Sequence, residues 1–173
     1  VQQELHRWGR ASRVVFDATK ESFHVLSKVS PWGGSFTLLG VEFDPKLLMN
    51  TAVHDCVVSA GWKLRTLLRT RRFHTSRDLM NLFRAQILSF LEYRTAVFLH
   101  ACATTLAPLD RILERFLRDL GVLDQDALLH FNLAPLSLRR DMAALGVIHR
   151  TVLGKGPKHF KEWFYLDIVE RRH

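Results

Sequence analysis

The spacing of hydrophobic positions changes near Pro45. Before it, short runs rich in branched and aromatic side chains, at Arg13 to Phe16, Ser22 to Ser27 and Phe36 to Phe43, are typical of strands. A proline and two glycines between Lys28 and Ser35 mark a loop. The second and third runs therefore could pair as a β-hairpin across this loop.

The third run is the most strand-like, because apolar side chains fall on both of its alternating sides. We expect it to be covered on both faces. Gly40 lies inside it, and a glycine within a strand usually marks a bulge or the close approach of another backbone. A short helix over Glu4 to Arg13 precedes the strands.

After Pro45 the pattern becomes helical. A core-facing stripe at spacings of three and four residues comprises Val53, Val57, Ala60, Leu64 and Leu67. Further helices are expected over Ser76 to about Ala103, with Ser76 as N-cap and a break near Glu92 and Tyr93; from Pro108 to a stop at Gly121; over Asp124 to His130; and over Leu136 to Leu153. The sequence thus predicts an α+β protein, predominantly α-helical, with a small N-terminal β-hairpin followed by a helical bundle.

The net charge and its distribution indicate a class of binding partner. The 173 residues have a net charge of +8 and are 47% hydrophobic, enough for a core. Eight cations and two anions lie between Gly61 and Arg94, so most of the excess is local. A localised positive field attracts polyanions, which makes nucleic acid the first partner to consider and an anionic membrane the second.

The cationic segment has a definite candidate surface. Trp62, Arg65, Arg69 and Arg72 recur at helical spacing on the side away from the apolar stripe, with Lys63 beside them. Guanidinium groups arranged in this way could follow a phosphate backbone. The alternative is a solvated basic face on a helical protein-interaction module.

Features that the sequence lacks limit the cellular location and the metal chemistry that we expect. No apolar run reaches the roughly 18 residues that a membrane span needs, and no secretory signal is visible. With two cysteines, we expect an intracellular protein, nuclear or cytoplasmic. The pairs His54/Cys56 and His100/Cys102 are two residues apart and do not share a helical face, so buried structural cysteines are expected rather than zinc ligands.

No catalytic set can be identified. A two-metal polymerase or nuclease needs carboxylates that converge on Mg²⁺, and no Asp-Asp pair occurs. A phosphate-binding loop and a nucleophile elbow are also missing.

The order of features resembles the C-terminal part of the reverse transcriptases of non-LTR (LINE-type) retrotransposons. The matching pieces are a helix with Trp8, the strand region Phe16 to Lys20, Phe-x-x-Leu-Gly at Phe36 to Gly40, the basic helix, Ile-x-x-x-Leu-Glu-Tyr at Ile87 to Tyr93, the segment Leu109 to Gly121, and Leu-x-Leu-Arg-Arg-Asp at Leu136 to Asp141. Their shared order covers nearly the whole chain.

The resemblance implies a division into a palm end (1–45), a helical thumb (46–121) and a C-terminal helical extension (122–173). It implies that Phe36, Leu39 and Gly40 belong to the primer grip, and that Lys63, Arg65, Arg69 and Arg72 face an RNA–DNA or DNA duplex. The complete enzyme would use Mg²⁺. The Tyr/Phe-x-Asp-Asp motif would lie upstream of Val1, so we expect a catalytically incomplete piece that needs no cofactor itself, from a truncated element copy or a gene-model fragment. Its oligomeric state stays open.

Overall fold

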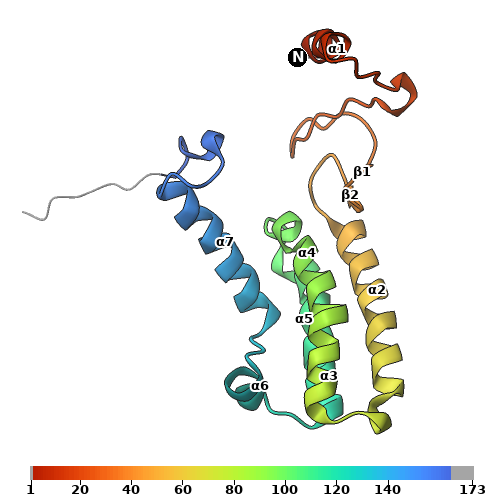
Figure 1. Cartoon of the computed structure of the whole chain (residues 1–173), viewed down its shortest axis with the longest axis vertical. Helices are drawn as coiled ribbons and strands as arrows, with labels where there is room; N and C mark the ends of the chain where they lie inside the picture. The colour runs from red at the N-terminus through yellow and green to blue at the C-terminus, as the bar shows by residue number, and fades with distance from the viewer. Residues whose placement is uncertain (1, 165–173) are drawn as a thin grey trace, which may run out of the picture.

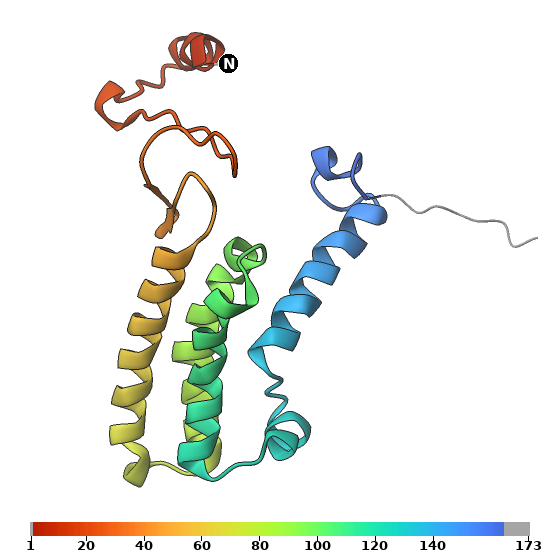
Figure 2. The same ribbon diagram turned by 180° about the vertical axis from the view of Figure 1, so that it is seen from behind.

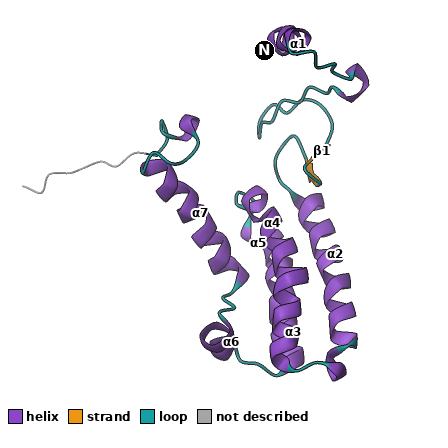
Figure 3. Cartoon of the chain, in the orientation of Figure 1, coloured by secondary structure: helices purple, strands orange, loops and turns teal. Residues whose placement is uncertain are grey.

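The computed structural model describes residues 2–164, which form a helical bundle with one small hairpin (Figure 1). The two strands are β1 (Phe36–Leu38) and β2 (Val41–Phe43). The α-helices are α1 (Gln2–Ala11), α2 (Asn50–Arg69), α3 (Ser76–Phe83), α4 (Ser89–Phe98), α5 (Ala103–Leu120), α6 (Asp124–Phe131) and α7 (Leu136–Val152). Short 3₁₀ turns are η1 (Ala18–Lys20), η2 (Arg71–Phe73) and η4 (Lys158–Phe160), and η3 (Arg84–Leu88) is a π-helical turn. The predicted fold class, α+β and predominantly α-helical, is confirmed (Figure 3).

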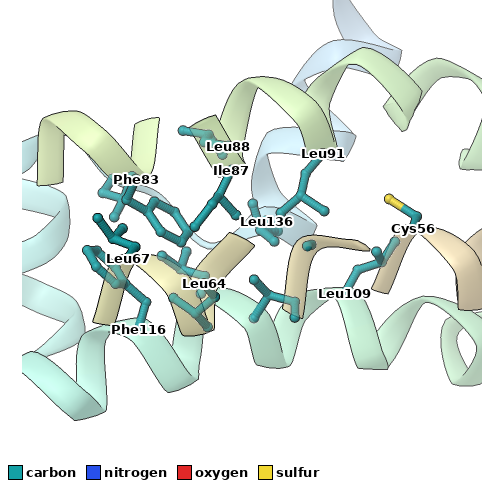
Figure 4. Packing of buried hydrophobic residues seen from close by; sticks show 14 of the residues in the cluster. Cys56, Leu64, Leu67, Phe83, Ile87, Leu88, Leu91, Leu109, Phe116 and Leu136 are labelled. Carbon is teal, nitrogen blue, oxygen red and sulfur yellow. The ribbon is translucent and has the colours of Figure 1, made fainter. Parts of the chain in front are cut away.

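The bundle is built on α2, which lies along α5 and beside the α3–α4 rod (Figures 1 and 2). The predicted stripe on α2 is confirmed: Val53, Ala60, Leu64 and Leu67 are buried, and Val57 packs against them. Within the core, beside Leu67, the rings of Phe83 and Phe116 stack with centroids 4.2 Å apart, and both are fully buried (Figure 4). The hydrophobic cluster runs from Val41 to Leu136, and thus crosses both expected boundaries of the thumb.

The entry to α2 is fixed by Asp44. Its carboxylate accepts hydrogen bonds from the backbone N–H groups of Lys46 (3.1 Å), Leu48 (3.0 Å) and Met49 (2.7 Å). Burial alone would raise the pKa of Asp44, but these three bonds outweigh it and lower the pKa. All three donors precede Asn50, the first residue of α2, so the carboxylate fixes the turn that leads into the helix, while the helix itself has no side-chain cap.

The predicted pairing of the strands was wrong. The run from Phe36 to Phe43 folds back on itself, so that Phe36 pairs with Phe43 and Leu38 with Val41. Ser22 to Ser27 contributes only an isolated bridge, between Val25 and Trp32, and Arg13 to Phe16 forms no strand. The expectation of cover on both faces also fails, because Leu38 is 53% exposed.

Gly40 explains why the run folds back. Leu39 and Gly40 both have positive φ (51° and 74°), as the two-residue turn of a tight hairpin requires. A Cβ at Gly40 would meet nothing within 4 Å, so no other backbone approaches it and that expectation is corrected. The glycine serves the turn. Tyr93 on α4 holds the turn by donating its hydroxyl hydrogen to the Leu39 carbonyl oxygen at 3.1 Å.

Three helix boundaries also differ from those predicted. The N-cap of α3 is Thr75, which forms a capping box with Asp78, one residue before the expected Ser76. The helix continues through Glu92 and Tyr93 to Phe98, and the irregularity in this rod lies earlier, in the π-helical turn Arg84–Leu88. Pro108 lies inside α5 rather than at its start, since Leu106 N–H already bonds to the Cys102 carbonyl at 3.1 Å.

The predicted C-terminal ends of α5 and α7 are confirmed. Gly121 ends α5 in a left-handed conformation (φ 66°), and Gly154 follows the end of α7 with φ 73°.

Two consecutive arginines attach α7 to the bundle. Arg140 forms a bidentate pair with Asp110 on α5, at 2.8 and 2.9 Å, and Arg139 pairs with Glu92 on α4.

The segment before the hairpin lies apart from the bundle, with α1 at its far end (Figure 1). Helix α1 was predicted over Glu4 to Arg13 and forms over nearly the same residues. Phe16 packs on Gly9, where a Cβ would come within 2.3 Å of the ring, and edge-on against His6. No residue of the described part before Val41 belongs to the main hydrophobic cluster. None of the helices within residues 2–164 is long and apolar enough to cross a membrane.

The ring stack in the core predicts a large loss of stability on truncation. Phe116→Ala should lower the free energy of unfolding by about 3–5 kcal/mol, because it removes buried apolar surface and leaves a cavity against Phe83. Urea denaturation followed by circular dichroism measures this loss. Phe23→Ala is the matched control, since Phe23 is 72% exposed, and it should change stability by no more than about 0.5 kcal/mol. Equal losses for the two variants would contradict the assigned core.

Candidate nucleic-acid interface

Helix α2 presents the predicted basic stripe on the side opposite its buried face. Trp62, Arg65 and Arg69 are three and seven residues apart, so they fall on one strip of a helix with 3.6 residues per turn. All three are exposed, and Trp62 remains 60% accessible. The guanidinium of Arg65 lies over the Trp62 ring, 4.7 Å from its centroid. The structure therefore brings these three residues together as predicted.

Arg72 extends the stripe beyond the helix. Helix α2 ends at Arg69, and Arg72 follows in η2, where its guanidinium lies 4.6 Å from the centroid of the Phe73 ring. Phe73 is 70% exposed. Cations at this end also complement the partial negative charge of the helix C-terminus. We define the basic face as Trp62, Arg65, Arg69, Arg72 and Phe73.

Lys63 does not belong to the basic face. It lies one residue after Trp62, which turns it about 100° around the helix axis. Its Nζ lies 5.2 Å from the centroid of the Phe90 ring on α4, and Arg94 lies over the same ring at 4.2 Å. The structure thus separates Lys63 from the other predicted residues and groups it with Arg94 at the Phe90 ring.

The arginines of the basic face are electrostatically available. None of the ion pairs found within residues 2–164 involves Arg65, Arg69 or Arg72. Elsewhere in the molecule, Arg139 and Arg140 are bound to carboxylates. An exposed guanidinium with no carboxylate partner keeps its donors free for phosphate, which it can bind with two parallel hydrogen bonds.

More cations gather at the same end of the bundle. Arg71 donates through Nη1 to the carbonyl oxygen of Asp119 at 3.3 Å, which ties the end of α2 to the end of α5. The end of α5 and the start of α3 lie at this end of the bundle (Figure 1). These two segments include Arg118 and Arg77, both of which are exposed. Sequence reasoning missed Arg118 and Phe73 as site residues. Arg118 is far from α2 in sequence, so no local pattern connects it with the basic face. The Arg-Arg-Phe run at η2, in contrast, could have been recognised from the sequence.

The proposed primer-grip residues lie at the other end of α2. Phe36 stacks on Phe43 with centroids 5.5 Å apart, while Leu39 and Gly40 form the exposed tip of the hairpin. Helix α2 has 20 residues, about 30 Å at 1.5 Å per residue, and it separates the hairpin from Arg69. The two groups of predicted residues therefore form no single site.

The two cysteines have opposite environments. Cys56 is 2% exposed, and burial raises the pKa of its thiol to about 11. Cys102 is exposed, so its predicted burial was wrong: it precedes the first residue of α5, where the chain turns outward. Hydrogen bonds from Thr104 and then Thr105 lower the pKa of Cys102 to about 7. Within residues 2–164, no three His, Cys, Asp or Glu side chains are grouped so that they could hold a metal ion.

Comparisons with known proteins give no assignment. No protein-family model matches the chain, and neither curated proteins nor solved structures show a significant similarity to it.

The lowered pKa of Cys102 predicts selective alkylation. The thiolate is the reactive form, so the rate of reaction with iodoacetamide should rise with pH around a midpoint of about 7 at Cys102, while Cys56 stays unreactive in the folded protein. Thr104→Val should move this midpoint upward, because it removes the largest stabilising contact. Peptide mass spectrometry reads both sites. A midpoint near the ordinary thiol value of about 8.5 would contradict the assignment.

Proposed function

We propose that this chain binds nucleic acid through the basic face, as the duplex-positioning part of a polymerase that resembles a non-LTR reverse transcriptase. The observation that carries the proposal is the row of three exposed arginines without carboxylate partners, two of which lie over exposed aromatic rings. Nucleotidyl transfer would need metal-binding carboxylates from outside this chain. Mg²⁺ would belong to that complete enzyme, and its place of action would be intracellular, in the nucleus or the cytoplasm.

The dimensions of the basic face suit a phosphate backbone. From Trp62 to Arg69, the last residue of α2, is seven residues, or about 10 Å along the helix axis. The phosphates of one strand advance about 3.4 Å each along the axis of a duplex, so a row of this length laid parallel to that axis faces roughly three of them. A row of phosphates offers these arginines the partners that the protein does not supply.

Contacts between the segments that carry the resemblance give the second line of support. The Phe-x-x-Leu-Gly segment meets the Leu-Glu-Tyr segment through the bond from Tyr93 to Leu39. The same Leu-Glu-Tyr segment meets Leu-x-Leu-Arg-Arg-Asp through Glu92 and Arg139. Residues of three motifs thus hold the hairpin, α4 and α7 together. As a group they build a scaffold for α2.

The proposal predicts salt-dependent binding that depends on the three arginines. For a DNA duplex, the slope of log affinity against log salt is about −0.9 per neutralised phosphate. Replacing Arg65, Arg69 and Arg72 by Gln should therefore make the slope shallower by about 2.7. Fluorescence anisotropy with a labelled duplex, measured over a salt series, gives the slope.

A matched control removes the same charge elsewhere. Arg7, Arg10 and Arg13 are exposed on the N-terminal segment, away from α2, and their replacement by Gln should leave the slope unchanged. Absence of binding at low salt, or equal slopes for the two triple variants, would overturn the proposal.

That negative outcome would favour a second candidate function, a helical protein-interaction module. The observation behind it is an apolar stripe on the solvent side of α7. Leu138, Met142 and Leu145 are spaced four and three residues apart and are 47%, 62% and 58% exposed. Under this function, the basic face would be solvated and polyanions would not compete for the protein partner.

A further inference from the structure

The basic face contains two aromatic rings that phosphate binding does not explain. Trp62 and Phe73 are 60% and 70% exposed, although each is a large apolar side chain. Each has a guanidinium over its ring, from Arg65 and Arg72 respectively. Arginines could contact phosphates equally well beside small polar residues. The two exposed rings therefore favour a ligand that has flat apolar surfaces as well as negative charge.

We propose that Trp62 and Phe73 stack on unpaired bases, so that the basic face binds single-stranded nucleic acid in preference to blunt duplex. This inference rests on the proposed binding of nucleic acid through the basic face, and it makes a single strand rather than a duplex the preferred ligand of that face. In a duplex, the faces of the bases are covered by their neighbours, and an aromatic ring on a protein surface reaches only edges and backbone. In a single strand the base faces are open, and aromatic rings accept any base.

The arrangement of cations and rings matches this ligand. Trp62 lies on α2 and Phe73 in η2, just past the end of that helix, with Arg65, Arg69 and Arg72 between them in the sequence. A strand whose bases stack at the two rings would carry its intervening phosphates past the arginines. The guanidinium over each ring holds it in place and adds a cation–π attraction.

Other aromatic residues near the cations differ from Trp62 and Phe73. Tyr93 is exposed and has the Arg94 guanidinium 5.9 Å from its ring centroid, but its hydroxyl is bonded to the Leu39 carbonyl oxygen and the same guanidinium lies closer to Phe90. Phe90 is half-buried and is contacted by both Lys63 and Arg94. Trp32 is as exposed as Trp62, at 62%, yet its ring partner is Phe23 rather than an arginine. Trp32 therefore provides a matched control.

The experiment compares two labelled probes in the full chain at one low salt concentration: a 12-nucleotide oligothymidine and a blunt DNA hairpin with the same number of phosphates. We expect tighter binding of the oligothymidine. Trp62→Leu should weaken that binding about tenfold, in keeping with the loss of one stacked base, and change hairpin binding less than twofold. Trp62→Phe, which keeps a ring, should retain most of the affinity.

Two further variants complete the design. Phe73→Leu should act as Trp62→Leu does, and Trp32→Leu should leave both affinities unchanged. Since all three side chains are largely in solvent, circular dichroism should show unaltered folding. The inference is overturned if the hairpin binds as tightly as the oligothymidine, or if Trp62→Leu weakens both probes equally or neither.

The outcomes also separate this inference from the function on which it rests. If the hairpin binds with the expected dependence on Arg65, Arg69 and Arg72 while Trp62→Leu has no effect, only the stacking inference fails. If neither probe binds at low salt, the proposed function fails and the inference fails with it.

Discussion

The burial of one face of α2 is the constraint on which the rest of the structure depends. Ala60, Leu64 and Leu67 are held against the bundle core, beside the stacked rings of Phe83 and Phe116. Once that face is inside, the helical period leaves no freedom for the opposite face, and Arg65 and Arg69 must point to solvent. The part of the basic face that lies on α2 is thus a consequence of core packing.

The surrounding elements keep α2 in place from both ends. At its start, the Asp44 carboxylate pairs three backbone N–H groups, and the hairpin inserts Val41 into the core. At its end, Arg71 reaches the carbonyl of Asp119 on α5. Helix α7 is attached to the bundle through Arg139 and Arg140. Its apolar stripe, which comprises Leu138, Met142 and Leu145, stays exposed. A stable bundle thus carries two surfaces of different chemistry, one cationic and aromatic, one apolar.

The sequence predicted the helices well because their buried stripes and stops are local signals: the α2 stripe and the stop at Gly121 were both legible. Prediction from the sequence failed where contacts between residues distant in sequence, or the backbone conformation of a turn, determine the structure. Nothing local shows that Leu39 takes a left-handed conformation and folds the strand back, since Gly40 is equally compatible with a bulge. Lys63 was expected beside the arginines from the family resemblance, whereas helical rotation separates it from Trp62 and its Nζ lies over the Phe90 ring. Cys102 was misplaced because a chain turn before α5 overrides the apolar pattern around it.

Arginine footprinting measures whether nucleic acid lies along the solvent face of α2. Phenylglyoxal modifies accessible guanidinium groups, and mass spectrometry of peptides from the free and oligonucleotide-bound protein reports protection at each arginine. Binding along α2 should protect Arg65, Arg69 and Arg72, with Arg10 and Arg13 on the N-terminal segment modified equally in both states. Protection confined to the N-terminal segment, or none at Arg65 and Arg69 under conditions of full binding, would contradict it.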